Sequence, residues 1–197
     1  MLTEFEVIIL AAGEARRFGS PKQLARWQGQ PLLQHAIQLT LDLGFKPWLV
    51  LGAHRSQILS DGGVDAGACH VVCAENWHQG LSFSIKAALR QVMIEKPQLK
   101  GVVFLLADQP LLSTNDLKSL FHVIQENDAK IVCSKYHNSM GVPAYFPCRY
   151  IDDLLVLEGD KGAKSLIEMH PHIAVPLNTS LVDIDVPEDL MSLLQNG

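Results

Sequence analysis

Glycine, arginine and lysine are concentrated in one short segment near the start of the chain, Leu10–Leu24, with the sequence LAAGEARRFGSPKQL. An apolar run that stops at small residues is typical of a buried strand that feeds a loop, and Val7–Leu10 is such a run. Glycine lets backbone N–H groups approach an anion, and arginine or lysine supplies charge to phosphate oxygens. The segment predicts a polyphosphate-binding loop containing Gly13, Arg17 and Lys22. The alternative is an ordinary strand-to-helix turn with solvated arginines.

This loop differs from two common phosphate-binding motifs. Gly19 is followed by Ser-Pro-Lys rather than Lys-Ser/Thr, and no glycine lies between Gly13 and Gly19, which excludes both G-x-x-x-x-G-K-[ST] and G-x-G-x-x-G. Pro21 lacks an N–H group and holds Ser20 in an extended conformation, so we expect no helix directly behind the glycines.

Two carboxylates follow apolar runs later in the chain. Asp108 comes directly after Val102–Ala107, and Asp185 ends the run Leu181–Asp185, which we expect to be a further strand. Two carboxylates beside a phosphate loop suit Mg²⁺, which uses carboxylates together with substrate phosphates. Alternation along a strand places Asp183 on the same face as Asp185, so both are candidates. We favour Asp185 because it lies nearer the carboxyl end.

Apolar runs alternate with segments of helical period along the chain. Strands are expected at 5–10, 48–51, 70–74, 102–107 and 130–134. Helices are expected from Pro31 to Gly44, around 85–92, around 117–124 behind a capping box of Ser113 and Asp116, and from Pro187. This alternation predicts an α/β sheet covered on both faces, whose ligands bind beyond the carboxyl ends of the strands.

Composition narrows the class of protein. The chain has 197 residues, of which 48% are apolar and 19% charged, and its net charge is −5. We expect one domain over residues 1–197, with no general nucleic-acid-binding surface. No segment is apolar for long enough to span a membrane and no signal peptide is evident, so we expect a cytoplasmic protein. The cysteines Cys69 and Cys73 are expected to pack as small apolar side chains in a reducing compartment.

The pattern L-A-A-G-x-x-x-R-F-G-x-P-K-Q-L resembles the signature loop of nucleotidyltransferases related to molybdenum cofactor biosynthesis, most closely the molybdenum cofactor cytidylyltransferases. The resemblance extends to L-L-A-D-Q-P at Asp108 and D-I-D-V-P-E-D-L at Asp185 and covers nearly the whole chain. It implies a three-layer, doubly wound, mostly parallel sheet of the Rossmann-like nucleotidyltransferase (glycosyltransferase-A) type. It also implies Mg²⁺ on Asp108 and Asp185, and catalytic roles for Arg17, Lys22 and Asp108.

Two further segments resemble this family. Asn76–Ser84 is similar to N-x-x-x-x-G-x-x-x-S, so the implied nucleotide-binding residues are Leu10, Ala11, Ala12, Gly13, Lys22, Asn76, Gly80 and Ser84. From the residues alone, a capped helix start at Ser82 fits that segment equally well. Matches to G-x-P and G-D-x-G-A-R imply acceptor-binding residues Gly141, Pro143, Gly159, Asp160, Gly162 and Lys164; the plainer interpretation is an edge strand, a helix and a glycine-rich turn.

The sequence departs from the family pattern at two positions. Lys164 replaces the usual arginine and loses its bidentate fork, and Ala15 replaces a common serine and its hydroxyl. Neither change removes the motif that contains it.

The resemblance implies transfer of CMP from CTP to the terminal phosphate of molybdenum-loaded molybdopterin, for use by a molybdenum hydroxylase. The run Ala11-Ala12-Gly13 is similar to the cytidylyl branch, whereas the guanylyl branch usually carries an extra glycine. Three alternatives remain: a nucleotidyltransferase using GTP or acting on a sugar or alcohol phosphate, a non-catalytic carrier of the finished cofactor, and a nucleotide-binding regulator.

Overall fold

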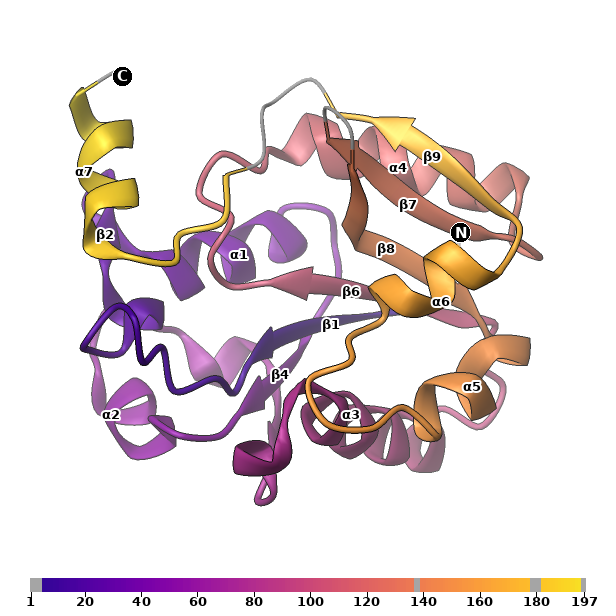
Figure 1. The fold of residues 1–197 in the computed structure, drawn as a ribbon, viewed down its shortest axis with the longest axis horizontal. Helices are drawn as coiled ribbons and strands as arrows, with labels where there is room; N and C mark the ends of the chain where they lie inside the picture. Colours follow the sequence, from indigo (N-terminus) through magenta and orange to yellow (C-terminus); the bar gives the residue numbers. More distant parts are fainter. Residues whose placement is uncertain (1–4, 137–138, 178–181, 196–197) are drawn as a thin grey trace.

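The computed structural model describes residues 5–136, 139–177 and 182–195, and a seven-stranded sheet forms its centre (Figure 1). The spatial order of the strands is β5-β4-β1-β6-β8-β7-β9, and β8 alone among these seven runs antiparallel to its neighbours. The strands are β1 (Phe5–Ala11), β4 (Trp48–Leu51), β5 (His70–Cys73), β6 (Gly101–Leu106), β7 (Ile131–Tyr136), β8 (Ser139–Pro147) and β9 (His172–Pro176). The five strands predicted over residues 5–134 are confirmed to within two residues at each end.

Helices cover both faces of the sheet. One face carries α1 (Leu32–Leu41), α2 (Arg55–Ser60) and α4 (Thr114–Glu126), and the other carries α3 (Leu81–Glu95), α5 (Ile151–Leu155) and α6 (Lys164–Met169). Short 3₁₀ turns occur at Lys22–Leu24, Ala66–Ala68, Trp77–Gln79 and Cys148–Tyr150. The predicted three-layer, doubly wound fold is therefore confirmed.

The alternation of side chains along β1 explains why both faces need covering. Val7 and Ile9 pack against the α1 and α4 layer, while Ile8 and Leu10 pack against the α3 layer. A strand buried on both faces has a continuous apolar sequence, as expected for parallel sheets between helices. The capping box of Ser113 and Asp116 at the start of α4 is also confirmed.

The strand that contains Gly141–Phe146 corrects one expectation. The plainer interpretation of this segment was an edge strand, yet β8 lies between β6 and β7 in the interior of the sheet. Proline inside a sheet is tolerated at a bulge, where no ladder hydrogen bond is lost. The pairing of β7 with β8 shifts from Cys133↔Ala144 to Ser134↔Gly141, so Pro143 lies in that bulge.

The C-terminal segment corrects a second expectation. Residues 182–185 form no strand, and Leu181 lies outside the described residues. The Ile184 N–H donates to the Asp108 carbonyl at 3.0 Å, and the Ile184 side chain is buried against Trp27 and Leu32. The segment is thus held by a backbone hydrogen bond and a buried side chain, and α7 (Pro187–Gln195) follows it beside the β2 (Arg26–Trp27) and β3 (Gln30–Pro31) hairpin (Figure 1).

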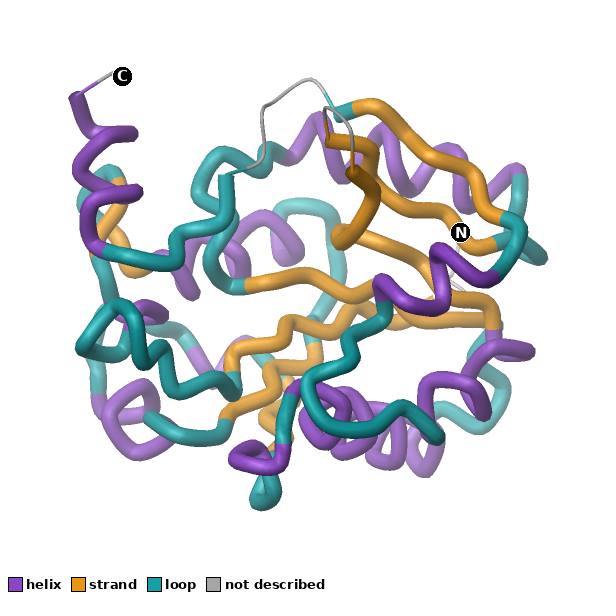
Figure 2. Tube along the Cα trace, in the orientation of Figure 1, coloured by secondary structure: helices purple, strands orange, loops and turns teal. Residues whose placement is uncertain are grey.

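The strand order reverses direction between β1 and β6. The chain proceeds from β1 to β4 on one side, and β6 pairs with β1 on the other. Ligands of open α/β sheets bind at such a point, beyond the carboxyl ends of the strands. Figure 2 shows loops gathered there, including the segment after β1 and the approach to α7. Among the described residues, no helix is both long and apolar enough to cross a membrane.

Candidate active site

A cleft of about 460 Å³ opens at this reversal point. Its walls come from the end of β1, the loop behind it, the start of α3 and the end of β6. Of the predicted nucleotide-binding and catalytic residues, those that line it are Leu10, Ala11, Ala12, Gly13, Lys22, Gly80, Ser84 and Asp108. The structure therefore brings together residues that are up to 98 positions apart in the sequence, and their roles stay predictions.

The loop after β1 is tied back to the protein through three successive carbonyl groups. The Ala12 carbonyl accepts from the Ala53 N–H at 3.1 Å, the Gly13 carbonyl from Gln23 Nε2 at 2.9 Å, and the Glu14 carbonyl bonds to His54 Nε2 at 2.8 Å. The N–H of a trans peptide points away from its carbonyl. The amides that follow these carbonyls therefore point away from those partners, a direction suited to binding an anion.

Gln23 was not identified as important from the sequence. Its side chain is buried and also donates to the Ala11 carbonyl at 2.9 Å, so one amide group holds the end of β1 and the start of the loop. The K-Q-L end of the signature pattern was the available signal. Arg16 was also missed: it lines the cleft, while its guanidinium bonds to Glu14.

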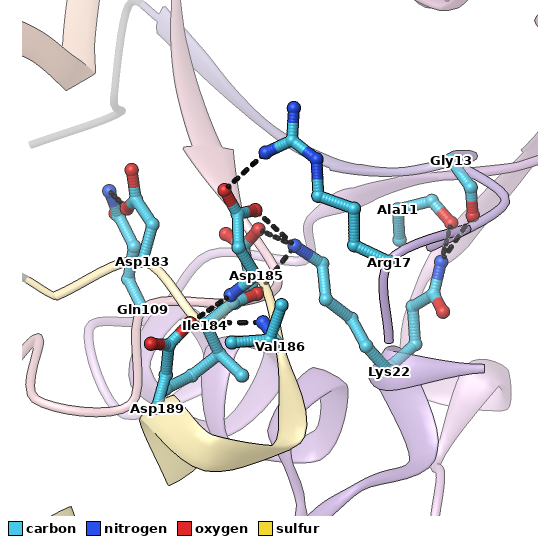
Figure 3. A network of polar contacts seen from close by, with 12 residues as sticks. Ala11, Gly13, Arg17, Lys22, Gln109, Asp183, Ile184, Asp185, Val186 and Asp189 are labelled. Carbon is cyan, nitrogen blue, oxygen red and sulfur yellow. Dashed lines mark hydrogen bonds and ion pairs between the residues drawn. The ribbon is translucent and has the colours of Figure 1, made fainter. Parts of the chain in front are cut away.

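Lys22 lies at the centre of a polar network on the acidic side of the cleft (Figure 3). Its Nζ atom lies 2.5 Å from Asp108 Oδ2 and 3.5 Å from Asp185 Oδ1, and it donates to the Ile184 carbonyl at 2.7 Å. One ammonium group thus contacts the two carboxylates that were predicted to bind metal. A divalent cation bound between those carboxylates would compete with it directly.

The surroundings of Asp108 disfavour the negative charge of its carboxylate. Burial raises the pKa of Asp108 above its ordinary value, and the Lys22 ammonium opposes this shift. Its Oδ1 atom is buried and accepts no hydrogen bond from the described residues. A hard oxygen ligand without a partner fits Mg²⁺ or Mn²⁺. Within the described part of the chain, no cluster of three or more His, Cys, Asp or Glu could hold a metal, so substrate oxygens or water would complete the coordination.

Asp185 and Asp183 engage different partners, contrary to what their alternation suggested. Asp185 pairs with Arg17 at 3.2 Å as well as with Lys22, whereas Asp183 Oδ1 accepts from Gln109 Nε2 at 3.0 Å. The prediction of a regular strand was wrong here, and the buried Ile184 between them fixes the segment instead. Arg17 does not line the cleft; its side chain is largely exposed beside Asp185.

The segment before α3 contributes other residues than expected. Asn76 is exposed and absent from the cleft walls, whereas Trp77 and His78 line it. Gly80 precedes α3 as its N-cap residue with φ of 115°, and Ser82 is buried and makes no cap, so the alternative of a helix capped by Ser82 was wrong. A Cβ atom at Gly80 would lie 2.3 Å from the Gly159 carbonyl carbon and oxygen, which joins this segment to the loop at 159–163.

The predicted acceptor residues divide between two places. Gly141, Gly162 and Lys164 line a second cavity of about 370 Å³, which shares Leu10, Leu81 and Leu106 with the cleft. Asp160 lines the cleft itself. Gly159 lies against Gly80, and Pro143 is buried in β8 with its carbonyl accepting from Ser134 Oγ at 2.7 Å.

Comparison with known proteins identifies the family. Residues 7–174 match the MobA-like NTP transferase domain, and the chain belongs to this family. The purine catabolism protein PucB of Bacillus subtilis is 27% identical over 195 residues, with 92% of each chain covered.

Solved structures agree with this assignment. Rv0371c from Mycobacterium tuberculosis has a TM-score of 0.84 at 27% identity, over 99% of this chain and 100% of its own. Its complex with manganese has a TM-score of 0.82 at 26% identity, over the same shares of the two chains. The molybdopterin-guanine dinucleotide biosynthesis protein A of Archaeoglobus fulgidus shares the fold, with a TM-score of 0.71 at 18% identity over 98% of this chain and 100% of that one.

Proposed function

We propose that this member of the MobA-like NTP transferase family transfers CMP from CTP to the terminal phosphate of molybdenum-loaded molybdopterin. An oxygen of the acceptor phosphate attacks the α-phosphorus of CTP, and the bond to the β-phosphate oxygen breaks to release pyrophosphate. The products are molybdopterin cytosine dinucleotide and pyrophosphate. The family supports nucleotidyl transfer, and the sequence motifs support the donor and acceptor.

Positioning and charge neutralisation would supply the catalysis, because phosphoryl-group transfer needs little covalent help from a protein. The amides after Ala12, Gly13 and Glu14 would hold the triphosphate. Lys22 would turn from the carboxylates to the phosphates and offset charge on the departing pyrophosphate. Arg17, whose side chain is exposed beside the site, could reach the same charge.

Asp108 and Asp185 would hold Mg²⁺. The buried Asp108 Oδ1 without a partner and the Asp185 carboxylate, both near Lys22 Nζ, fit the oxygen preference of that ion. When bound, Mg²⁺ would orient the α-phosphate and neutralise developing charge. The manganese complex of Rv0371c concerns a relative of this chain and agrees with a divalent metal of this type.

The preference for CTP rests on Ala11 and Ala12. Both line the cleft, and their methyl groups would narrow the base pocket towards a pyrimidine. A glycine in their place would leave more room for a purine. Comparable turnover with GTP would contradict this assignment.

We also propose that residues 1–197 act as one nucleotidyltransferase domain in the cytoplasm and deliver the product to a molybdenum hydroxylase. The four cysteines are all free thiols, as is usual in a reducing compartment. Cys73 is partly exposed beside Arg55 and Glu75 rather than packed as a small apolar residue, so that expectation was wrong for it.

One observation carries this proposal: Lys22 bridges two carboxylates beside the loop after β1 at the reversal point of the sheet. The test is pyrophosphate release with Mg²⁺ and molybdenum-loaded molybdopterin, with CTP, GTP and ATP compared in parallel. Release with CTP alone would support donor and acceptor together, and release with another triphosphate would overturn the base assignment. No release with any of them would reject this acceptor and favour another phosphate or a carrier role.

A further inference from the structure

The second cavity has apolar walls and one polar end. Leu81, Ile85 and Phe104 belong to its walls, and Gln109, Tyr136 and Asp183 supply the polar end. Its volume of about 370 Å³ and its shared wall with the nucleotide cleft suit one part of a second substrate. Apolar walls of this kind suit the apolar face of a ligand ring.

Gln109 at the polar end is held in one orientation. It is 5% exposed, and its Nε2 atom donates to the Val142 carbonyl at 3.2 Å and to Asp183 Oδ1 at 3.0 Å. These two bonds use both amide protons, which fixes the side-chain oxygen on the other side. That oxygen, Oε1, is buried and accepts no hydrogen bond from the described residues.

Tyr136 lies next to this amide. Its Oη atom is also buried without a hydrogen-bond partner of good geometry among the described residues. Burial raises the pKa of Tyr136 above its ordinary value, so the hydroxyl stays protonated and can donate or accept. Asp183 lines the same cavity, and a carboxylate with one bond from Gln109 keeps further lone pairs for a ligand.

The polar end is therefore rich in acceptors. The Gln109 side-chain oxygen is buried, and leaving it without a donor is costly, while the exposed Asp183 carboxylate keeps lone pairs for further N–H donors. A pair of adjacent N–H groups on a flat ring would match a carboxylate in a bidentate manner. A 2-amino-4-oxopyrimidine edge, as found in pterins, offers that pair together with an apolar ring face.

We propose that Asp183 and Gln109, assisted by Tyr136, recognise the amino-pyrimidine edge of the phosphate acceptor and determine acceptor specificity. Asp183 is then an acceptor-recognition residue and not the second metal ligand. Figure 3 shows Asp183 with Gln109, apart from the contact between Lys22 and Asp185. The identity of the acceptor rests on the proposed function. The new assignment concerns the residues that bind and select that acceptor.

The test is direct binding of pterin and lumazine to the protein of residues 1–197, without metal or nucleotide, followed by ligand fluorescence. Lumazine carries oxygen where pterin carries the 2-amino group. We expect pterin to bind at least about tenfold more tightly than lumazine, which corresponds to about 1.4 kcal/mol. Asp183→Asn should remove most of this ratio, because the neutral amide accepts one N–H less well and presents its own donor.

Asp185→Asn is the matched comparison, since it removes the same charge two residues away, where the side chain faces Lys22 and Arg17. Its metal-free affinity for pterin should stay within about twofold of that of the unmodified protein, against a tenfold loss for Asp183→Asn. Circular dichroism of both variants would verify the fold.

Equal affinities for the two ligands, no binding of either, or an unchanged ratio in Asp183→Asn would overturn the inference. Each result is distinct from failure of the proposed function. Pyrophosphate release with CTP and molybdopterin by a protein that shows no pterin preference would reject only the inference. A pterin preference that depends on Asp183, without pyrophosphate release, would reject only the proposed reaction.

Discussion

The Nζ atom of Lys22 lies 2.5 Å from Oδ2 of Asp108, and both side chains are more than four-fifths shielded from water. A buried pair gains little over apolar packing, but removing one partner leaves the other charge uncompensated. Removing Lys22 and removing Asp108 should therefore have different effects on stability. Without Lys22 the buried Asp108 carboxylate loses the charge that offsets its burial, whereas Lys22 has further partners in Asp185 and the Ile184 carbonyl.

Lys22→Met should lower both stability and activity. We expect a loss of about 3 kcal/mol in the free energy of unfolding, because the Asp108 charge loses its partner. Turnover should fall by about 10²-fold or more, as for loss of one preorganised charge contact. Urea denaturation and pyrophosphate release measure the two effects.

Mg²⁺ should raise the melting temperature of Lys22→Met more than that of the unmodified protein, since the ion no longer competes with the ammonium group. Lys118→Met on the exposed face of α4 provides the control and should behave as the unmodified protein does. An equal Mg²⁺ effect in all three proteins would show that the metal does not enter between these carboxylates.

Asp108→Asn should lower activity strongly but change stability little. The change removes a buried charge, and Lys22 keeps its bonds to the Ile184 carbonyl and to Asp185. We therefore expect a melting temperature within a few degrees of that of the unmodified protein, corresponding to less than about 1 kcal/mol. Pyrophosphate release should fall by about 10³-fold, because a metal ligand is lost. An unfolded product would mark Asp108 as a structural residue.

The sequence predicts the sheet well because its strands are buried on both faces. All four residues of Trp48–Leu51 are buried, and a continuous apolar run of this kind is typical of a strand covered by helices on both faces. The position of β8 was not predictable in this way. The plainer sequence interpretation was an edge strand, and only the pairing with β7 reveals the bulge that accommodates Pro143 in an interior strand.

In the candidate site, too, some features could be predicted from the sequence and others could not. The residues at the ends of β1 and β6 were predicted because strand ends meet at one edge of a parallel sheet. The different partners of Asp183 and Asp185 depend on the burial of Ile184 against Trp27, a contact distant in sequence. Gln23 was missed because the K-Q-L motif marks its position but does not show that its side chain bonds to the Ala11 and Gly13 carbonyls.

Asp189→Asn should weaken the hydrogen bonds that hold the segment before α7 and so lower the melting temperature. The Asp189 Oδ2 atom accepts from the N–H groups of Asp185 at 2.8 Å and of Val186 at 2.9 Å. These bonds lower the pKa of Asp189 below its ordinary value, and the bond from Val186 contributes more than the bond from Asp185. The variant keeps the shape but loses the charge that strengthens both bonds.

The pH dependence of this effect has a definite sign. A lowered pKa contributes stability above the ordinary value for aspartate, and that stability is lost as the pH falls through the lowered value. The difference in melting temperature between the unmodified protein and Asp189→Asn should thus be constant above about pH 5 and shrink below about pH 4. A difference that grows on acidification would contradict the role of the carboxylate.

Gly80→Ala should disturb the contact between the start of α3 and the loop at 159–163. A methyl group there would lie 2.3 Å from the Gly159 carbonyl, and φ at this position is 115°. We expect a loss of about 1–3 kcal/mol in the free energy of unfolding, from backbone strain and overlap together. Gly62→Ala is the control, because no atom lies within 4 Å of the added methyl, and it should change stability by less than about 0.5 kcal/mol.

The same variant should weaken binding of both substrates if the two cavities share this wall. Gly80 and Asp160 line the cleft proposed for the nucleotide, while Gly162 lines the second cavity, and the Gly80–Gly159 contact joins the two segments that carry them. Displacement of the loop should therefore raise KM for CTP and for the acceptor together, with a smaller change in kcat. A rise in only one KM would show that the loop serves one substrate and that the contact with Gly80 matters for folding alone.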